Sequence, residues 1–381
     1  MDHILGQDHA VELLRHQLSS GKGHHALIFH GPMGVGKFTT ALAYAQLLLC
    51  HEESSTETPR TSACGRCDSC RLFRAVDVLD HDDGEDELAA LTTAHPDLHI
   101  VRKELAMFSE DPKVRQQKQR VIPVDVLRSE LVGPAGLAPK LRHGKVFIID
   151  EAELMNASGQ NTILKTLEEP PPGTTIILVT SHEDRLLPTV RSRCLRVFFS
   201  PLPDEVVAQW CQQHMEGLTA SQRQALVAFA DGSLGRAELI RRYGLLTWYD
   251  TIPPALDRAA QGHFTPDLGQ SIHSLVDGFA SEWVKTHTNA SKEAANHQAV
   301  DLMLALIASH ARKRLVEISA EHPSNQSEVF RDRLGPWLAV IDATTDAQRM
   351  IASNVNMRMV CEHLAVSVMN ALVGVVKCTI I

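Results

Sequence analysis

The stretch GPMGVGKFTT holds the residues whose types and spacing most clearly indicate chemistry. Gly31, Gly36 and Lys37 have the G-x₄-G-K spacing of a phosphate-binding loop, with Gly34 between them. In such a loop the backbone N–H groups enclose phosphate oxygens, and the lysine reaches the β- and γ-phosphates. The next residue is normally Ser or Thr, whose hydroxyl binds Mg²⁺. Here it is Phe38, whose side chain has no oxygen.

The aromatic residue at position 38 predicts a site in which ATP binding, with or without Mg²⁺, is still possible but hydrolysis is poor or absent. Thr39 cannot simply replace the missing hydroxyl, because one step along a helix turns the side chain by about 100°. Phosphoryl transfer needs Mg²⁺ to bridge the phosphates and offset the developing charge. The alternative is a glycine-rich turn without a ligand, but a strand before it and a helix after it favour the phosphate-binding loop.

Two carboxylates follow a second apolar run, KVFIIDEAE, which begins at residue 145. A buried strand would deliver Asp150 and Glu151 to the carboxyl edge of a sheet, where α/β proteins place ligand chemistry. Asp150 would orient Mg²⁺ through water, and Glu151 would polarise the attacking water. The alternative is a solvated helix cap. This half of the site looks competent, but it cannot supply the metal ligand that the loop lacks.

Four cysteines have the spacing of a metal site: Cys50, Cys64, Cys67 and Cys70 form the pattern C-x₁₃-C-x₂-C-x₂-C. Closely spaced thiolates in a cytosolic chain favour tetrahedral Zn²⁺ over disulfides. Four protein ligands leave no position for water, so the metal would be structural. Free thiols and redox chemistry are the alternatives.

Two arginines are placed where they could contact phosphate. Arg193 lies in PTVRSRC, after a predicted helix, and could act on a neighbouring chain as an arginine finger, which stabilises a transferring phosphoryl group. Arg236 lies in DGSLGRAELI and could contact the chain's own nucleotide. Taken alone, neither position is specific, because most surface arginines are simply solvated.

The elements that must position these residues are of two kinds. The first 200 residues alternate between short apolar runs and helical patterns, which predicts an α/β domain with a parallel sheet and helices on both faces. After residue 204 only helical patterns remain. We therefore expect an α/β domain at 1–200 with a zinc module at 50–70, a small helical lid at 201–243 and a larger all-α domain at 244–381.

The overall charge argues against an autonomous DNA-binding protein. The net charge is −9, and removing the seven acids of residues 77–87 leaves −2. Strong DNA binding needs a basic surface that neutralises phosphates. The basic stretch 113–120 is either a DNA contact or a solvated loop. Neither a membrane span nor a signal peptide is predicted, so the chain is expected to be cytoplasmic.

The order of motifs along the chain resembles the AAA+ clamp-loader subunits of bacterial DNA polymerase III. Besides the loop and the cysteines, the resemblance rests on ILGQ, HPDLHIV, TLEEPPPGT, RLLPTVRSRC and GSLGRA. It extends from residue 4 to about residue 243 and returns in RMIASNVNMRMVCEHL at 349–364. The resemblance implies that residues 1–200 form an AAA+ nucleotide-binding domain and that residues 244–381 form an oligomerisation collar. Residues 245–345 match only in helical character.

Within that family the chain looks like the delta-prime branch, because the gamma/tau motor keeps Thr after the lysine and tau carries further C-terminal domains. The resemblance implies a stator that offers Arg193 in trans to a neighbouring ATPase. Arg236 then matches the sensor-2 arginine and Thr180 the sensor-1 position, while Glu151 is a vestigial candidate. The implied partners are gamma/tau, delta, the sliding clamp and primer-template DNA, within a holoenzyme in which this chain is not itself the polymerase.

Two other functions fit parts of the sequence. One is a gamma/tau-like motor ATPase that recruits Thr39 to the metal. The other is a stand-alone P-loop enzyme with a helical substrate domain, which would leave the Ser-Arg-Cys run unexplained.

Overall fold

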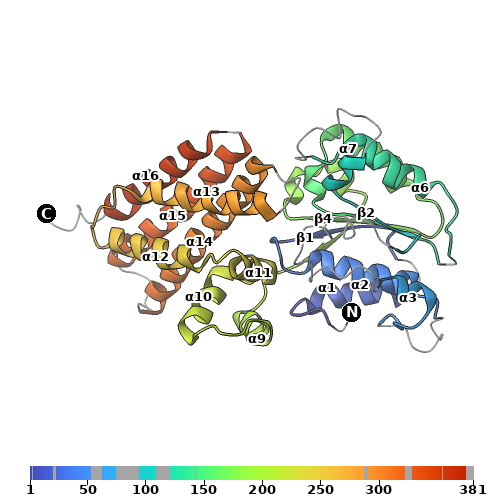
Figure 1. The fold of residues 1–381 in the computed structure, drawn as a ribbon, viewed down its shortest axis with the longest axis horizontal. Coiled ribbons are helices and arrows are strands. Elements are labelled where there is room, and N and C mark those ends of the chain that lie inside the picture. The colour runs from blue at the N-terminus through green and yellow to red at the C-terminus, as the bar shows by residue number, and fades with distance from the viewer. Residues whose placement is uncertain are drawn as a thin grey trace. The chain divides into compact units, whose positions relative to one another are not determined.

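The chain folds into two compact units, Met1–Val206 and Val207–Ile381, which are described separately here (Figure 1). The computed structural model describes residues 1, 3–19, 23–52, 62–73, 94–108, 121–141, 143–286, 291–321, 328–353 and 355–374. The acidic stretch 77–87 and the basic stretch 113–120 lie outside the described residues. Among the helices of the described ranges, none is long and apolar enough to cross a membrane.

The first unit is built on a five-stranded sheet in which every pairing is parallel, in the order β2-β3-β4-β1-β5. Strands buried on both faces have continuous aliphatic runs, as in ALIFH, KVFII and TTIILVT. This confirms the predicted α/β class. The strands are β1 (Ala26–His30), β2 (Leu98–Val101), β3 (Lys145–Ile149), β4 (Thr174–Thr180) and β5 (Leu195–Phe198).

Each face of the sheet has its own apolar core, because strand residues alternate between the faces. In β1, Leu27 and Phe29 enter one core, whereas Ala26 and Ile28 enter the other. The first core is covered by α1 (Asp8–Ser19), α2 (Lys37–Leu49) and α3 (Asp68–Phe73) (Figure 1). The second is covered by α5 (Val124–Leu127), the π-helical turn η3 (Arg128–Val132), α6 (Gly133–Ala135), α7 (Ala157–Glu168) and α8 (Pro188–Arg191).

The carboxyl edge of this sheet positions the candidate site. Because the strands are parallel, the segments that follow them emerge at one edge. There β1 leads into residues 31–37, β2 into Arg102, β3 into Asp150 and β4 into Ser181. Short 3₁₀ turns follow three of these strands: η2 (Lys103–Phe108), η4 (Ala152–Leu154) and η5 (Glu183–Arg185).

The described residues of the second unit form helices joined by turns, with no strand among them. Helices α13, α14, α15 and α16 pack against one another, and α12 packs on α14 and α16. The predicted boundary between a lid and a collar at residues 243 and 244 falls inside this unit and stays a prediction. The helices are α9 (Asp204–His214), α10 (Ala220–Ala230), α11 (Leu234–Arg242), α12 (Leu246–Ala260), α13 (Leu268–Thr286), α14 (Lys292–Glu321), α15 (Glu328–Ala352) and α16 (Met357–Gly374).

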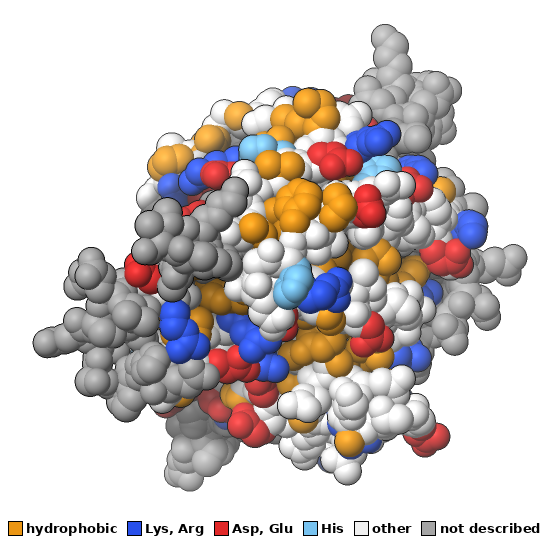
Figure 2. All heavy atoms as spheres, turned by 90° about the vertical axis from the view of Figure 1, so that its left-hand side faces the viewer, with side chains coloured by type: hydrophobic (Ala, Val, Ile, Leu, Met, Phe, Trp, Pro, Cys, Tyr) orange, Lys and Arg blue, Asp and Glu red, His pale blue; other side chains and the backbone are white. Residues whose placement is uncertain are grey.

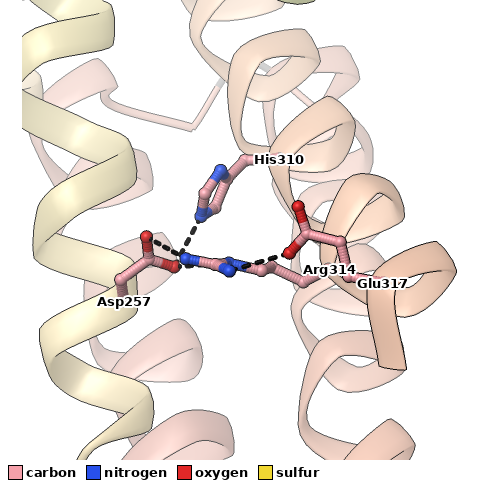
Figure 3. Close-up of polar contacts among 4 residues, drawn as sticks. All are labelled: Asp257, His310, Arg314 and Glu317. Atoms are coloured by element: carbon pink, nitrogen blue, oxygen red, sulfur yellow. Dashed lines mark hydrogen bonds and ion pairs between the residues drawn. The ribbon is translucent and has the colours of Figure 1, made fainter. Parts of the chain in front are cut away.

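A polar network joins α12 to α14 in this unit (Figure 3). The Asp257 carboxylate accepts hydrogen bonds from Arg314 Nε at 2.9 Å and Arg314 Nη2 at 2.5 Å, and it pairs with His310 Nε2 at 2.8 Å. Arg314 also donates to Glu317 at 2.8 Å. Burial tends to raise the pKa of Asp257, but the bonds from Arg314 and His310 outweigh it and lower the pKa.

Replacing Asp257 should therefore destabilise the second unit, because Arg314 and His310 would lose their shared acceptor. We expect Asp257→Asn to lower the free energy of unfolding by about 1–3 kcal/mol. Asp346→Asn, at an exposed pair on α15, should cost no more than about 0.5 kcal/mol. The probe is tryptophan fluorescence during urea unfolding, since all 4 tryptophans of the chain lie in this unit. Equal losses in both variants would contradict the assignment.

Candidate functional site

The loop at residues 31–37 has the backbone of a phosphate-binding loop. Gly31, Gly34 and Gly36 have φ angles of 146°, 74° and 96°, a region that side chains with a Cβ rarely adopt. At Gly31 a Cβ would also lie 2.1 Å from the Phe199 carbonyl oxygen, so only glycine fits between β1 and β5. The loop then opens α2 at Lys37, which places the helix N-terminus at the loop.

Lys37 is buried and its ammonium group closes the loop from inside. Nζ donates to the carbonyl oxygens of Gly31 at 2.8 Å and Pro32 at 2.5 Å, and to Ser181 Oγ at 3.1 Å. Burial lowers the pKa of Lys37 to about 8, against the opposing effect of Glu153 and Asp150. A phosphate group bound here would replace these carbonyl contacts of the ammonium group.

Gln7 holds the loop from the other side, a role that the sequence analysis did not assign. Its Nε2 donates to the carbonyl oxygens of Val35 at 3.1 Å and Ser200 at 2.8 Å, and its Oε1 accepts from Ser200 N at 3.2 Å. The side chain is buried and joins the loop to the segment after β5. A buried amide with every contact to backbone positions the loop; nothing in the spacing of ILGQ indicates this.

Phe38 stacks on an arginine instead of standing free. The Arg102 guanidinium carbon lies 4.3 Å from the centroid of the Phe38 ring, a cation–π contact. Arg102 Nε also lies 3.2 Å from Asp150 Oδ2, an ion pair whose two side chains are about four-fifths buried. Burial raises the pKa of Asp150, and the guanidinium opposes that rise. Asp150, the carboxylate that the sequence predicts to orient Mg²⁺, is thus paired with a cation of the protein itself.

Glu151, the residue after Asp150, is paired in the same way with Lys103, the residue after Arg102. Lys103 Nζ donates to Glu151 Oε2 at 2.6 Å. Burial alone would lower the pKa of Lys103, but Glu151 and Glu104 outweigh it and raise the pKa. Glu151 also has a left-handed backbone with φ of 50°, a conformation that costs energy outside glycine. Both carboxylates that the sequence assigns to Mg²⁺ and to water thus face a cation, and those two roles stay predictions.

The threonines of the site are placed differently from each other. Thr39 is exposed in the first turn of α2. Thr180 is buried at the end of β4, and its Oγ1 accepts a hydrogen bond from His182 N at 3.0 Å. The next residue, Ser181, contacts Lys37, and its N–H donates to Glu153 Oε1 at 3.1 Å. The sensor-1 role of Thr180 stays a prediction.

Arg193 lies directly after α8 and is held by its own chain. Its Nε donates to Glu168 Oε1 at 2.6 Å, and its Nη1 donates to the Thr189 carbonyl oxygen at 2.7 Å. Glu168 is the last residue of α7, which the prolines that begin at Pro170 terminate. The arginine side chain is about one-third exposed, so its guanidinium is oriented and still accessible.

Arg236 belongs to the second unit and is mostly buried in α11. Its Nη1 donates to the Ala230 carbonyl oxygen at 3.2 Å and lies 3.6 Å from Asp231 Oδ2. Asp231 also accepts from Arg312 at 2.6 Å. Burial lowers the pKa of Arg236, with Asp231 opposing that effect. The guanidinium is thus anchored within its own unit, and the sensor-2 role stays a prediction.

The four predicted thiols come together at the end of α2. The sulfurs of Cys50, Cys64, Cys67 and Cys70 all lie within 4.8 Å of one another, with Cys50–Cys67 at 4.0 Å and Cys64–Cys70 at 3.9 Å. A tetrahedral zinc with bonds of about 2.3 Å would separate its sulfurs by about 3.8 Å. The arrangement therefore fits a metal ion, and all four thiols are free of disulfides.

Backbone N–H groups point at these sulfurs, as they do around thiolates. The amides of Cys64, Cys67 and Cys70 donate to sulfurs of the cluster at 3.3–3.5 Å. Burial raises the pKa of Cys67, but N–H donation from Cys70 and His51 outweighs it and brings the pKa to about 7. Burial raises the pKa of Cys70 instead, so the pKa values of these two neighbouring thiols move in opposite directions. Thiolates are the form that binds metal.

A buried polar chain fixes the cluster to the sheet. Ser69 Oγ donates to the Leu49 carbonyl oxygen at 2.6 Å and lies 2.9 Å from His95 Nε2. The carboxylate of Asp97, two residues after His95, accepts from the backbone amides of Lys140 and Leu141 at 2.7 and 2.6 Å. The HPD motif is therefore structural, because it links α3 to the start of β2.

Comparison with known proteins places most of the first unit in one family. A family profile described as "DNA polymerase III, delta subunit" matches residues 6–203. DNA polymerase III subunit delta' of Pseudomonas aeruginosa is 31% identical over 58% of this chain and 57% of its own length. Subunit delta' of Escherichia coli is 29% identical over 57% and 54%. Subunit tau of Salmonella typhimurium is 31% identical over 83% of this chain and 44% of its own length.

The chain thus spans about half the length of the curated relatives it matches. A solved gamma-subunit-related protein from Thermotoga maritima aligns over 95% of this chain and 99% of its own, with 14% identity and a TM-score of 0.39, too low to support an inference. The family match covers about half of the chain and agrees with the resemblance seen in the motifs. The chain belongs to the DNA polymerase III delta subunit family.

Proposed function

We propose that the chain is a delta-prime-like subunit of a bacterial DNA polymerase III clamp loader, with weak or absent ATP hydrolysis of its own. The observation that carries this proposal is the aromatic ring of Phe38 at the metal-ligand position, stacked on the Arg102 guanidinium that pairs with Asp150. With gamma/tau and delta, the chain would help to load the sliding clamp onto primer-template DNA. Its own role would be that of a stator.

The residues of the loop fit a phosphate group but not a catalytic Mg²⁺. The glycines and Lys37 supply N–H and ammonium donors. Mg²⁺ prefers carboxylate, hydroxyl and water oxygens in an octahedron. Position 38 offers no oxygen, and Asp150 and Glu151 each face a cation of the chain. ATP binding is therefore compatible with the site, whereas metal-assisted hydrolysis is not.

The placement of Arg193 supports an arginine finger that acts in trans. The side chain lies at the end of α8, is partly exposed, and is oriented by Glu168 and Thr189. An arginine finger stabilises charge on a phosphoryl group that a neighbouring subunit transfers. Glu168 would keep the Arg193 guanidinium oriented until a phosphate group of the neighbouring subunit displaces the carboxylate.

Zinc is the metal that best fits the four thiolates. Four sulfurs at tetrahedral spacing favour a structural zinc with no open position for water. The ion would tie the end of α2 to α3, since Cys50 caps α2 and Cys70 lies within α3.

A gamma/tau-like motor subunit is the second candidate. The favouring observation is the match to a tau subunit over 83% of this chain, longer than the matches to delta' subunits. This candidate requires Thr39 or another residue to bind the metal. No observation on the described residues favours a stand-alone P-loop enzyme.

Hydrolysis by the isolated chain separates the two candidates. We expect purified wild-type protein with Mg²⁺ and ATP to show no turnover above that of Lys37→Ala, because the site lacks a metal ligand. Phosphate release measured on both proteins is the test. Brisk Mg²⁺-dependent turnover that Lys37→Ala abolishes would contradict the stator and favour the motor.

Replacing Arg193 should lower the ATPase rate of the assembled loader without changing the isolated chain. In a loader reconstituted with gamma/tau and delta subunits, Arg193→Ala should depress DNA-stimulated ATPase about tenfold or more, since a finger contributes about 10³–10⁵ in rate at its own site. Assembly, followed by size-exclusion chromatography, should be unchanged. Arg128→Ala, at an exposed pair, is the control. Wild-type turnover with Arg193→Ala would end the finger assignment.

Metal analysis tests the thiolate cluster. We expect about one zinc per chain, and Cys64→Ser should lose zinc and lower the thermal midpoint of the first unit. Cys211→Ala removes a buried thiol in α9, outside the cluster, and should keep the zinc. The contradicting result is full zinc content in Cys64→Ser.

A further inference from the structure

We propose that Arg102 is the permanent cation of this nucleotide site, so that the loop binds nucleoside triphosphates or diphosphates without a divalent metal. This inference deepens the proposed function and rests on residues 31–37 being a phosphate site. It concerns what replaces the metal, which the loss of hydrolysis by itself does not specify.

The sheet fixes Arg102 beside Asp150. Strands β2 and β3 are parallel neighbours in which Val101 is the partner of Ile149. The pairing continues one step further, because Asp150 N donates to the Val101 carbonyl oxygen at 3.0 Å. Arg102 and Asp150 are therefore the next residues of two adjacent strands. Their ion pair at 3.2 Å follows from strand register and does not depend on a flexible loop.

The ring of Phe38 provides the second contact of the Arg102 guanidinium. It is partly buried against the core on the α2 face of the sheet, so its position is fixed by packing. The guanidinium lies 4.3 Å from the ring centroid. A guanidinium is planar and weakly hydrated, and it stacks on aromatic faces. A hydroxyl at position 38 would suit a metal ion, whereas an aromatic ring suits this cation.

The neighbouring residues repeat this pairing of a cation after β2 with a carboxylate after β3. Lys103 neutralises Glu151 through the 2.6 Å bond, so both carboxylates that follow β3 face cations that follow β2. A divalent ion placed here would have to displace one cation or accept repulsion from both. Lys37 remains as the ammonium group enclosed by the loop, and it is the donor available to an incoming phosphate.

The test compares nucleotide affinity with and without metal in the full, zinc-loaded chain. Binding of a fluorescent ATP analogue is followed by anisotropy in excess Mg²⁺ and in EDTA. We expect the two wild-type dissociation constants to agree within about threefold. Tighter binding in Mg²⁺ by about tenfold or more would overturn the inference, as would the absence of binding in both conditions up to about 1 mM.

Two variants identify the residue responsible. Arg102→Gln frees Asp150 and should make binding tighter in Mg²⁺ than in EDTA by about tenfold. Adding Asp150→Asn to that variant should remove the metal dependence again. Zinc content and thermal unfolding check the fold of both proteins. If Arg102→Gln folds and stays insensitive to Mg²⁺, Arg102 is not the cation that excludes the metal.

These outcomes are separable from failure of the proposed function. A wild-type chain that binds nucleotide only with Mg²⁺ but does not hydrolyse it would refute the permanent cation and leave the stator standing. A wild-type chain that hydrolyses ATP with Mg²⁺ would refute both. The Arg193→Ala result in the assembled loader is independent of either.

Discussion

The site depends on one guanidinium held between an aromatic ring and a carboxylate. Arg102 stacks on Phe38 and pairs with Asp150, and these three residues come from the segment after β2, the first turn of α2 and the segment after β3. A fixed cation in a partly buried place interacts strongly with its carboxylate and cannot diffuse away as a metal can. The glycine loop and its buried lysine are thus retained, while Asp150 and Glu151, the carboxylates predicted to act on Mg²⁺ and water, each face a cation of the protein.

The first unit also holds a second arginine that is more accessible than Arg102 and lies outside the candidate site. Arg193 follows α8, is about one-third exposed, and is held by Glu168 in an orientation from which a phosphate could take it. Arg102 is about four-fifths buried in the candidate site and Arg193 is more accessible outside it, a contrast that supports the proposed stator role. Around the face of the second unit, apolar side chains are interspersed with charged ones (Figure 2). Among the described residues of this unit, the exposed large apolar side chains are Phe264, Val316, Leu338, Met359 and Val366.

The strands and the thiolate cluster could be predicted from the sequence, because local patterns of residues determine both. The five strands are short aliphatic runs, and the thiolates converge because C-x₂-C-x₂-C spacing brings three sulfurs together in one turn region. The cations of Asp150 and Glu151 could not be predicted, since their pairing requires knowing that β2 lies next to β3. Residues 102 and 150 are far apart in the chain, and only register joins them. Gln7 and Glu168 were missed for the same reason.

Anomalous diffraction from crystals grown with ATP and Mn²⁺ tests the central claim most directly, because it locates the metal relative to the ring. The account predicts that the Arg102 guanidinium stays between Phe38 and Asp150, with no manganese on Asp150 even where a nucleotide occupies the loop. Manganese bound at Asp150, with Arg102 displaced from the ring and bridging oxygens of a triphosphate, would contradict it.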